Sequence, residues 1–425
     1  MASTYQLLKL EEICFLITDG KHGDCDNEAN SSYYFLSAKD IKDGRLVYDN
    51  ARQITKLDFL ETHKRTRLEP FDILISNSGT IGKIAIARDV ELTHRTTFQK
   101  SVAILKPNSS RVNPFWFYYS LNFEQERLIN TAVGTAQKNL LLRDLREFKI
   151  RVPPLPTQRK IAAILSAYDD LIENNTRRIR ILEAMAQAIY REWFVNFRYP
   201  GHEGVRLIES PLGPIPEGWE VKTVGEVLAS IESGSRPKGG IDANESDMPS
   251  IGAENIIGLG KYDYSKEKFV SREFFEKMNH GHVQSYDVLL YKDGAQIGRK
   301  SIFGDGFPHQ ECCINEHVFI LRTNNLCNQE YLYFWLDRPD VTQNIINLNS
   351  NAAQPGINQA GVKGLDIILP SKLLLNEFRF YIKPILSLIF KLALKNKTLV
   401  ETRDLLLPRL ISGELDVEAL EIPTL

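Results

Sequence analysis

The chain has 425 residues, of which 43% are hydrophobic and 25% charged. This length predicts two or more domains, and the composition is typical of folded proteins rather than disordered ones. The net charge of −2 gives no support for DNA binding, because an isolated DNA-binding domain is usually basic. Any DNA-binding charge would therefore be local or supplied by partners.

No segment predicts export or insertion into a membrane. The longest apolar run near the end, Ile385 to Leu394, is interrupted by Lys391 and is too short to span a bilayer. The first residues lack the charged and apolar regions of a signal peptide. The odd number of cysteines, five, indicates reduced thiols rather than a disulfide framework. We therefore expect a cytoplasmic protein that does not contact membranes.

The sequence contains an internal duplication. Tyr5–Ile13 aligns with Trp219–Val227 at an offset of 214 residues. The offset drifts only to 217 by Ala136-Gln137, which aligns with Ala353-Gln354. In both halves a proline follows 16 residues after that glutamine. So small a drift is hard to obtain by chance, and we expect two copies of one fold.

Each half is predicted to form an α/β domain followed by a long helix. In the first half, short strand-like runs such as Asp72–Ile75 and Ser101–Leu105 are separated by Gly, Asn and Ser turns. An aromatic helix follows in each half, at Pro114–Leu121 in the first and at Tyr331–Leu336 in the second. The predicted fold class is α+β, with two tandem α/β domains related by pseudo-twofold symmetry and separated by two long helices.

The two long helices carry a heptad pattern, with apolar residues alternating at four and three positions, which is typical of a coiled coil. Each seam contains one asparagine, Asn175 and Asn396. A buried asparagine costs stability but sets the register, because its amide needs a partner. Antiparallel packing with these two residues opposite each other also pairs Ile161 with Leu410, Tyr168 with Arg403 and Trp193 with Phe378.

A helix of about 38 residues is on the order of 57 Å long, which exceeds one turn of DNA at ~34 Å. The pair could therefore act as a spacer between two reading domains. The alternative is that the helices dimerise the chain or cover a core. Pro384 lies inside the second helix and should kink it or delay its start.

The chain lacks the patterns that would predict catalysis. Asn113-Pro114-Phe115 lacks the second proline of an adenine methyltransferase loop, and no Glu-x-Lys follows Pro339-Asp340 as a nuclease would need. The glycines of the segment from Ser78 to Lys83 do not have P-loop spacing. We expect that the chain alone is not an enzyme and binds no cofactor.

One cluster has the composition of a zinc site, because four possible ligands, His309, Cys312, Cys313 and His317, lie within nine residues. The duplication provides a control, since the equivalent positions in the first half are threonines and a serine. The same fold is expected there without ligands. Buried thiols and ordinary histidines are therefore favoured over a metal.

Four motifs in chain order resemble the type I restriction-modification specificity (S) subunits. Pro153–Ile161 resembles the Pro-Leu-Pro-x-Gln opening of their central conserved region, and Leu182–Phe194 resembles its end. Pro211–Val221 is similar to the usual entry to the second recognition domain, and Leu407–Leu415 to the distal conserved region. One departure is Pro370-Ser371-Lys372-Leu373, which lacks the Pro-x-Gln of the proximal motif.

The resemblance implies two DNA target-recognition domains that each read half of a split, asymmetric site in double-stranded DNA. It implies that the helices dock two methyltransferase (modification) subunits, with restriction (translocase-nuclease) subunits joining the assembly. S-adenosylmethionine, ATP and Mg are then expected on the partner subunits. The expected segments are a first recognition domain at 1–152, a central conserved helix at 153–198, a linker at 199–217, a second recognition domain at 218–369, a distal conserved helix at 370–415 and a C-terminal tail at 416–425.

Three loop regions recur in both halves and carry small polar or basic residues beside glycine or asparagine, as DNA reading requires. Most such loops are simply solvated turns, so this remains the alternative. The candidate DNA-binding residues are Lys21, His22, Ser78, Thr80, Lys83, Thr135, Gln137, Lys138, Asn139, Ser235, Arg236, Lys238, Lys292, Gln296, Arg299, Gln354 and Asn358. The strongest of them are the cations Lys21, Lys138, Arg236 and Arg299.

Two other functions remain open at this stage. The chain could be the specificity subunit of another restriction class, or a remnant that no longer assembles. It could instead be a two-lobed coiled-coil scaffold that binds proteins and never contacts DNA, which would fit its near-neutral charge.

Overall fold

The computed structural model describes residues 5–134, 138–237, 246–349 and 356–421. The chain forms two compact units: unit 1 comprises residues 1–170 and 400–425, and unit 2 comprises residues 171–399. Each long helix therefore contributes residues to both units. The bounds of the six segments expected from the sequence remain predictions. Among the described residues, no helix is both long and apolar enough to cross a membrane.

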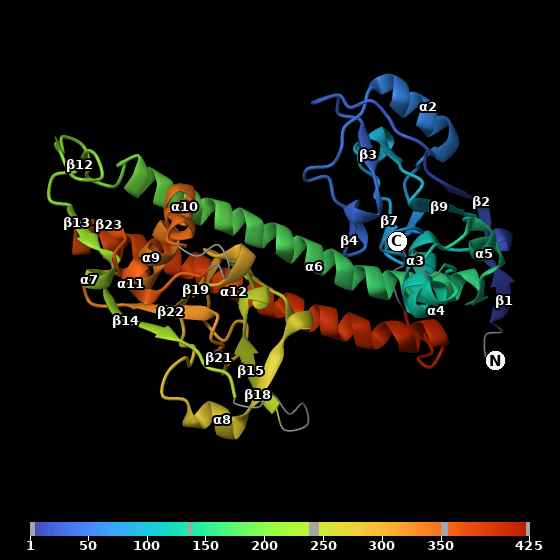
Figure 1. Ribbon diagram of the computed structural model, residues 1–425. Coiled ribbons are helices and arrows are strands. Elements are labelled where there is room, and N and C mark those ends of the chain that lie inside the picture. The colour runs from blue at the N-terminus through green and yellow to red at the C-terminus, as the bar shows by residue number, and fades with distance from the viewer. Residues whose placement is uncertain (1–4, 135–137, 238–245, 350–355, 422–425) are drawn as a thin grey trace. The chain divides into compact units, whose positions relative to one another are not determined.

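Unit 1 is built on a four-stranded antiparallel sheet of order β2-β9-β6-β7 (Figure 1). Smaller pairings flank it: β1 with β10, the parallel pair β3 and β8, and β4 with β5. Its elements before the long helix are β1 (Gln6–Lys9), α1 (Leu10–Ile13), β2 (Cys14–Asp19), β3 (Tyr34–Leu36), β4 (Ile41–Lys42), β5 (Arg45–Leu46), α2 (Lys56–Thr66), β6 (Ile73–Ser76), β7 (Ile84–Ile86), β8 (Thr96–Phe98), β9 (Val102–Pro107), α3 (Pro114–Phe123), α4 (Gln125–Asn130), α5 (Leu142–Glu147) and β10 (Lys149–Val152).

Unit 2 repeats this topology. Its four-stranded sheet has the order β14-β22-β19-β20, and the pairs β13–β23, β15–β21 and β16–β17 correspond to the three smaller pairings of unit 1. The elements are β11 (Leu207–Ile208), β12 (Ile215–Pro216), β13 (Glu220–Thr223), α7 (Val224–Val227), β14 (Leu228–Ser233), β15 (Ser246–Ile251), β16 (Ile256–Gly258), β17 (Lys261–Tyr262), β18 (Lys268–Ser271), α8 (Arg272–Lys277), β19 (Val288–Tyr291), β20 (Lys300–Ile302), β21 (Cys313–Ile314), β22 (Val318–Thr323), α9 (Gln329–Leu336), α10 (Pro339–Asn347), α11 (Gln359–Lys363) and β23 (Asp366–Leu369).

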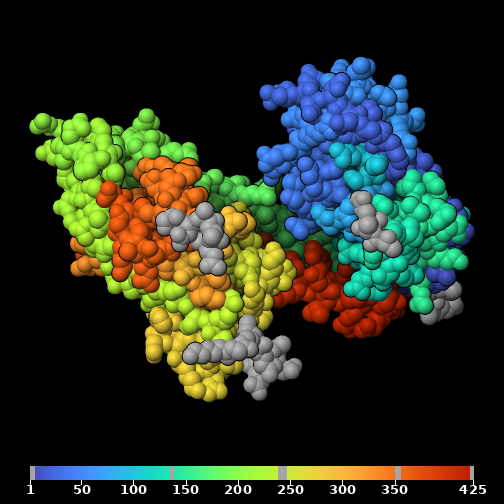
Figure 2. Space-filling model, viewed as in Figure 1, coloured from blue at the N-terminus to red at the C-terminus, as the bar shows by residue number. Residues whose placement is uncertain are grey.

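The shared strand order and parallel pairing confirm the duplicated α+β fold. In unit 1 the central sheet buries both faces, because successive side chains of a strand point in opposite directions. Ile73 and Ile75 of β6 join one hydrophobic cluster, which also contains Trp116 of α3, and Leu74 joins a second. In the space-filling view, residues coloured blue to cyan form the surface over these layers of unit 1 (Figure 2).

The aromatic helices α3 and α9 begin in the same way in both units. The side chain of Asn113 accepts a hydrogen bond from the backbone N–H of Trp116 at 3.0 Å, and that of Asn328 accepts from Tyr331 at 2.9 Å. An asparagine at this position satisfies a backbone donor that the first turn of a helix leaves unpaired. The repeated cap places each aromatic helix at the same point of its repeat.

The two long helices are α6 (Leu155–Tyr190), which continues as a π-helical turn at Arg191–Val195, and α12 (Lys372–Ser412). The expected delay of α12 at Pro384 was wrong, because the helix begins at Lys372 and runs through the proline. A proline lacks the N–H of one helical hydrogen bond. The rest of the 41-residue helix and its buried residues Ile382, Leu386 and Ile389 hold this stretch in place.

Gln158 of the Pro-Leu-Pro-x-Gln motif has a structural task in unit 1. Its side-chain oxygen accepts from the backbone N–H of Asn113 at 2.7 Å, and its amide donates to the carbonyls of Arg111 at 3.2 Å and Pro153 at 2.8 Å. The side chain is buried, and these bonds give both its amide oxygen and its amide nitrogen hydrogen-bond partners. The second repeat lacks this glutamine, and there Asn328 donates to the carbonyl of Leu375 at 2.8 Å.

Candidate nucleic-acid interface

The first candidate loop follows the edge strand of each central sheet. A glycine in this loop lies in close contact with the last residue of β8 in unit 1 and of β21 in unit 2. A Cβ atom on Gly20 would lie 2.1 Å from the carbonyl oxygen of Phe98, and one on Gly234 would lie 1.8 Å from that of Ile314. No other residue type fits without moving backbone. Both units therefore hold this loop beside the segment that follows β8 or β21.

The second candidate loop is joined to that same segment by a backbone hydrogen bond, and the residue that follows the third loop is joined to the second loop. In unit 1 the N–H of Asn77 donates to Ser101 at 3.0 Å, and the N–H of Leu140 donates to Asn77 at 2.9 Å. In unit 2 the N–H of Lys292 donates to His317 at 3.1 Å, and that of Ile357 to Lys292 at 2.9 Å. The structure thus brings the first and second sequence-predicted loops together at this segment, and the described ends of the third loops, Asn139 and Gly356, form bridges with the second loops.

Several candidate cations already have partners within the chain. Lys21 donates to Asp58 at 3.1 Å, which raises the pKa of the lysine, and Arg236 forms an ion pair with Glu316 at 2.9 Å. His22 lies 2.9 Å from Asp19. Lys83 donates to the carbonyl of Ala38 at 3.3 Å, and the ammonium of Lys292 lies 4.9 Å from the centre of the Phe319 ring.

Other candidates are exposed. Lys138 and Arg299 are both exposed, and within residues 5–134, 138–237, 246–349 and 356–421 neither side chain has a hydrogen-bond or ion-pair partner. Thr80 and Gln296 are also exposed. The exposure of these four side chains leaves them accessible to a large ligand.

The remaining candidates serve the loops themselves or lie outside the described residues. Ser78 and Asn139 form a β-bridge between the second and third loops, and Ser235 is half-buried. Asn358 caps α11 by accepting from the N–H of Gly361 at 2.8 Å. The candidates outside the described residues are Thr135, Gln137, Lys238 and Gln354.

The sequence analysis missed the segment to which these loops attach, Gln99–Ser101 in unit 1 and Asn315–His317 in unit 2. We call each of these a junction segment. Lys100 at the centre of the first is exposed, and its backbone N–H donates to the carbonyl of Lys21 at 3.0 Å. No turn composition marks the segment in the sequence, and only its basic residue could have drawn attention to it.

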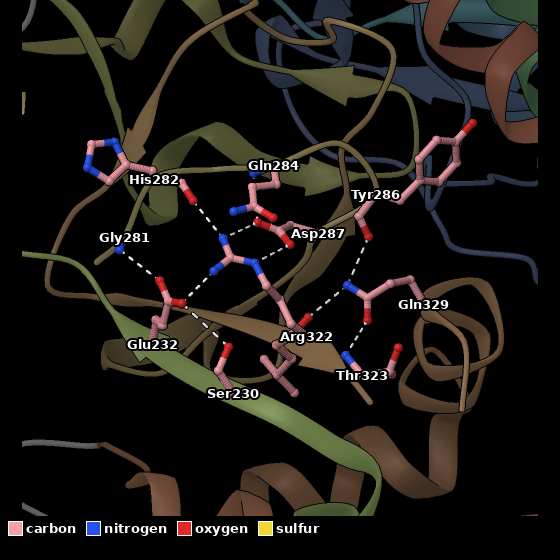
Figure 3. Close-up of polar contacts among 11 residues, drawn as sticks. Ser230, Glu232, Gly281, His282, Gln284, Tyr286, Asp287, Arg322, Thr323 and Gln329 are labelled. Carbon is pink, nitrogen blue, oxygen red and sulfur yellow. Dashed lines mark hydrogen bonds and ion pairs between the residues drawn. The ribbon is translucent and has the colours of Figure 1, made fainter. Parts of the chain in front are cut away.

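A charged cluster around Arg322 contacts Glu232, at the start of the first loop of unit 2 (Figure 3). The guanidinium of Arg322 donates to both oxygens of Asp287, at 2.8 and 2.7 Å, and also pairs with Glu232. Glu232 in turn accepts from the N–H of Gly281 at 2.9 Å. Burial raises the pKa of Asp287, and the arginine opposes this shift. The cluster fixes β14 just before Gly234.

Unit 1 has a lysine in place of this arginine. Lys106 donates to Asp72 at 2.6 Å and to Glu69 at 3.2 Å. Burial raises the pKa of Asp72 to about 6, although the lysine lowers it. Both repeats thus have a cation paired with a buried aspartate at the equivalent place. The cation is a lysine in unit 1 and an arginine in unit 2.

The residues of the zinc-like cluster each have separate surroundings. His309 is hydrogen bonded to Glu267, and His317 lies 2.9 Å from Asp293. Cys312 and Cys313 are buried, which raises the pKa of both thiols, that of Cys313 to about 11. Among the described residues no group of three or more His, Cys, Asp or Glu side chains has the arrangement of a metal site.

Comparison with known proteins identifies the family. The profile of the type I restriction modification DNA specificity domain matches residues 2–184 and 216–373. The chain therefore belongs to this family, and it carries two such domains. Sequence recognition for a type I restriction-modification system is its function, and it is not a catalytic subunit.

Two curated relatives have matching lengths. The chain is 26% identical to the type I restriction enzyme MjaIX specificity subunit of Methanocaldococcus jannaschii, over 91% of this chain and 87% of that one. It is 22% identical to the HindI specificity subunit of Haemophilus influenzae, over 92% and 96%. The fold is similar to the crystal structure of a type I S subunit from M. genitalium, with a TM-score of 0.60 and 15% identity over 96% of both chains.

Proposed function

We propose that this chain reads a bipartite, asymmetric site in double-stranded DNA, with one half-site recognised by each unit. The observation that carries the proposal is the repeated junction, where two polar loops and the described end of a third meet in both units. Exposed cations lie at or beside it, Lys100 and Lys138 in unit 1 and Arg299 in unit 2. Such donors suit phosphate oxygens and guanine edges.

The long helices are proposed to space the two half-sites and to dock partner subunits. A helix of 36 residues is about 54 Å long, more than one turn of DNA at ~34 Å. In unit 2, α12 exposes large apolar side chains, with Leu373 83% and Phe380 74% exposed. Exposed apolar groups in a cluster are typical of protein interfaces.

The partners proposed for these helices are two methyltransferase subunits, with restriction subunits joining them. S-adenosylmethionine, ATP and Mg would be bound by those partners. This assembly also accounts for the net charge of −2, since partner subunits would supply much of the phosphate contact. The complex would work in the cytoplasm, where its DNA lies.

The proposal is tested by co-purifying the full chain with its methyltransferase subunit and mapping methylated adenines across the genome. We expect a bipartite motif that disappears when the gene for this chain is deleted and returns when it is restored. An unchanged set of methylated adenines after deletion would contradict the proposal. Co-purification without any effect on methylation would favour the scaffold alternative.

A further inference from the structure

The central position of the junction segment has equivalent surroundings in both units and opposite charge: Lys100 in unit 1 and Glu316 in unit 2. On one side of it, a Cβ on Gly20 would lie 2.3 Å from the carbonyl oxygen of Gln99, and one on Gly234 would lie 2.5 Å from that of Asn315. The first loop therefore touches the preceding residue in each case.

On the other side, the second loop binds the following residue. The N–H of Asn77 donates to Ser101 at 3.0 Å, and that of Lys292 donates to His317 at 3.1 Å. The central residue is thus held between two loops, and the third loop is bonded to the second. A side chain at this position lies in the middle of the candidate interface rather than at its rim.

In unit 1 the central residue is an available cation, whereas Lys21 beside it is already paired. The neighbouring Lys21 donates to Asp58 at 3.1 Å and lies 3.7 Å from Glu61, and only 20% of its side chain is exposed. Lys100 is exposed and has no side-chain partner in the part of the chain that the structure describes. Its ammonium keeps all its donors for a ligand.

In unit 2 the central residue is an acid that holds a cation. One oxygen of Glu316 forms an ion pair with a guanidinium nitrogen of Arg236 at 2.9 Å and lies 3.3 Å from the ring nitrogen Nε2 of His317. The side chain of Arg236 is 52% exposed. A guanidinium has five donors in a rigid plane, so pairing one of its nitrogens with Glu316 orients the rest.

We propose that this central position sets base discrimination in each unit, Lys100 by contacting a guanine edge directly and Glu316 as a positioning residue that orients Arg236 toward one. The inference rests on the proposed DNA-reading function. Guanine presents two acceptors, O6 and N7, in the major groove, and both lysine and arginine donate to them. A contact with phosphate carries no sequence information.

The unit 1 half of the proposal is tested with Lys100→Ala in the full chain, bound to its methyltransferase subunits. Binding is measured to duplexes that carry each base pair in turn at every position of the site. We expect a roughly tenfold loss of discrimination at one guanine of one half-site, and an unchanged preference elsewhere. The matched control is Lys149→Ala, an exposed lysine on β10, which should leave discrimination unchanged.

A different result would show that Lys100 contacts phosphate. Affinity would then fall equally for all duplexes, and the slope of log K against log salt would decrease by about 0.9. That outcome overturns the inference for unit 1. It leaves the proposed function standing, because the wild-type complex would still discriminate among duplexes. A wild-type complex that bound all duplexes equally would contradict the proposed function itself.

The unit 2 half is tested with Glu316→Gln, which keeps the size of the side chain and removes its charge. We expect a severalfold loss of discrimination at one guanine of the other half-site, smaller than that of Arg236→Ala at the same base pair. Affinity for non-matching DNA should be unchanged or higher, because the variant is less negative. Glu316→Asp should restore part of the discrimination.

The control for unit 2 is Asp366→Asn on β23, the strand equivalent to β10. A Glu316→Gln variant that lowers the melting temperature but keeps full discrimination would overturn the positioning role, since it would then be only structural. Loss of discrimination in the half-site affected by Lys100→Ala would overturn it as well.

Discussion

The side-chain amide of Asn175 donates a hydrogen bond to the amide oxygen of Asn396 at 2.9 Å. Both lie in the seam of the two long helices within unit 2. Trp193 is 18 residues from Asn175 and Phe378 is 18 residues from Asn396, and their rings are 6.0 Å apart. The antiparallel pairing drawn from the sequence places the same residues opposite each other. The two asparagines differ in their other partners, because Asn396 also donates to the hydroxyl of Thr176 at 3.2 Å.

This difference predicts unequal effects for the two single variants. Asn396→Leu leaves the buried amide of Asn175 without its partner, which costs about 1–3 kcal/mol. Asn175→Leu costs less, because Asn396 keeps Thr176. The double variant should melt at a higher temperature than the wild type while the register loosens. Thermal denaturation measures all three, and a double variant less stable than either single variant would contradict the pairing.

The buried pair of Lys106 and Asp72 predicts a pH-dependent stability. The folded-state pKa of Asp72, about 6, lies above its ordinary value of 3.8. The corresponding stability is therefore fully present below about pH 4 and is lost as the pH rises through about 6. Lys106→Met should raise this pKa further and lower the free energy of unfolding at pH 8 by about 3–5 kcal/mol.

Urea denaturation at pH 8 and pH 5 checks this prediction. The loss caused by Lys106→Met should be smaller at pH 5, where Asp72 is protonated in the variant. Adding Asp72→Asn should recover most of the stability at pH 8, because no buried charge then remains. An equal loss at both pH values would show that the lysine contributes by packing alone.

Gln158 predicts a defect confined to unit 1. Gln158→Glu keeps an acceptor for the N–H of Asn113 but removes both donors, to Arg111 and Pro153. The buried carbonyl of Pro153 and the carbonyl of Arg111 then lose their partner and a charge is buried, so unfolding should require about 2–4 kcal/mol less. Hydrogen exchange locates the effect: amides of α3 should lose protection, whereas those of α9 in unit 2 should not.

Arg299 predicts a defect in recognition without a defect in folding. Because its side chain is exposed and has no partner among the described residues, Arg299→Ala should leave the melting temperature unchanged. Binding to one half-site should weaken by about 1–3 kcal/mol, and the other half-site should be unaffected. Arg206→Ala, an exposed residue between the repeats, serves as the control. Equal weakening of both half-sites would defeat the assignment.

Much of the fold could be predicted because it depends on patterns within short stretches of sequence. The nearly constant offset between repeats predicted two copies of one domain, and both central sheets have the same strand order. The heptad spacing predicted the long helices because side chains four and three residues apart share a helix face. The expected effect of Pro384 was partly wrong, since packing along α12 outweighs one missing hydrogen bond.

The sequence by itself determined the duplication, the helix seam and the loops that carry polar residues. Only the tertiary structure decided which of those residues are paired within the chain and which are not. Lys21 and Arg236 look equally available in the sequence, yet Asp58 and Glu316 bind them. Lys100 is central because residues near 21 and 77 bond to its segment and Leu140 bonds to Asn77. Such contacts join distant parts of the chain, and no local pattern encodes them.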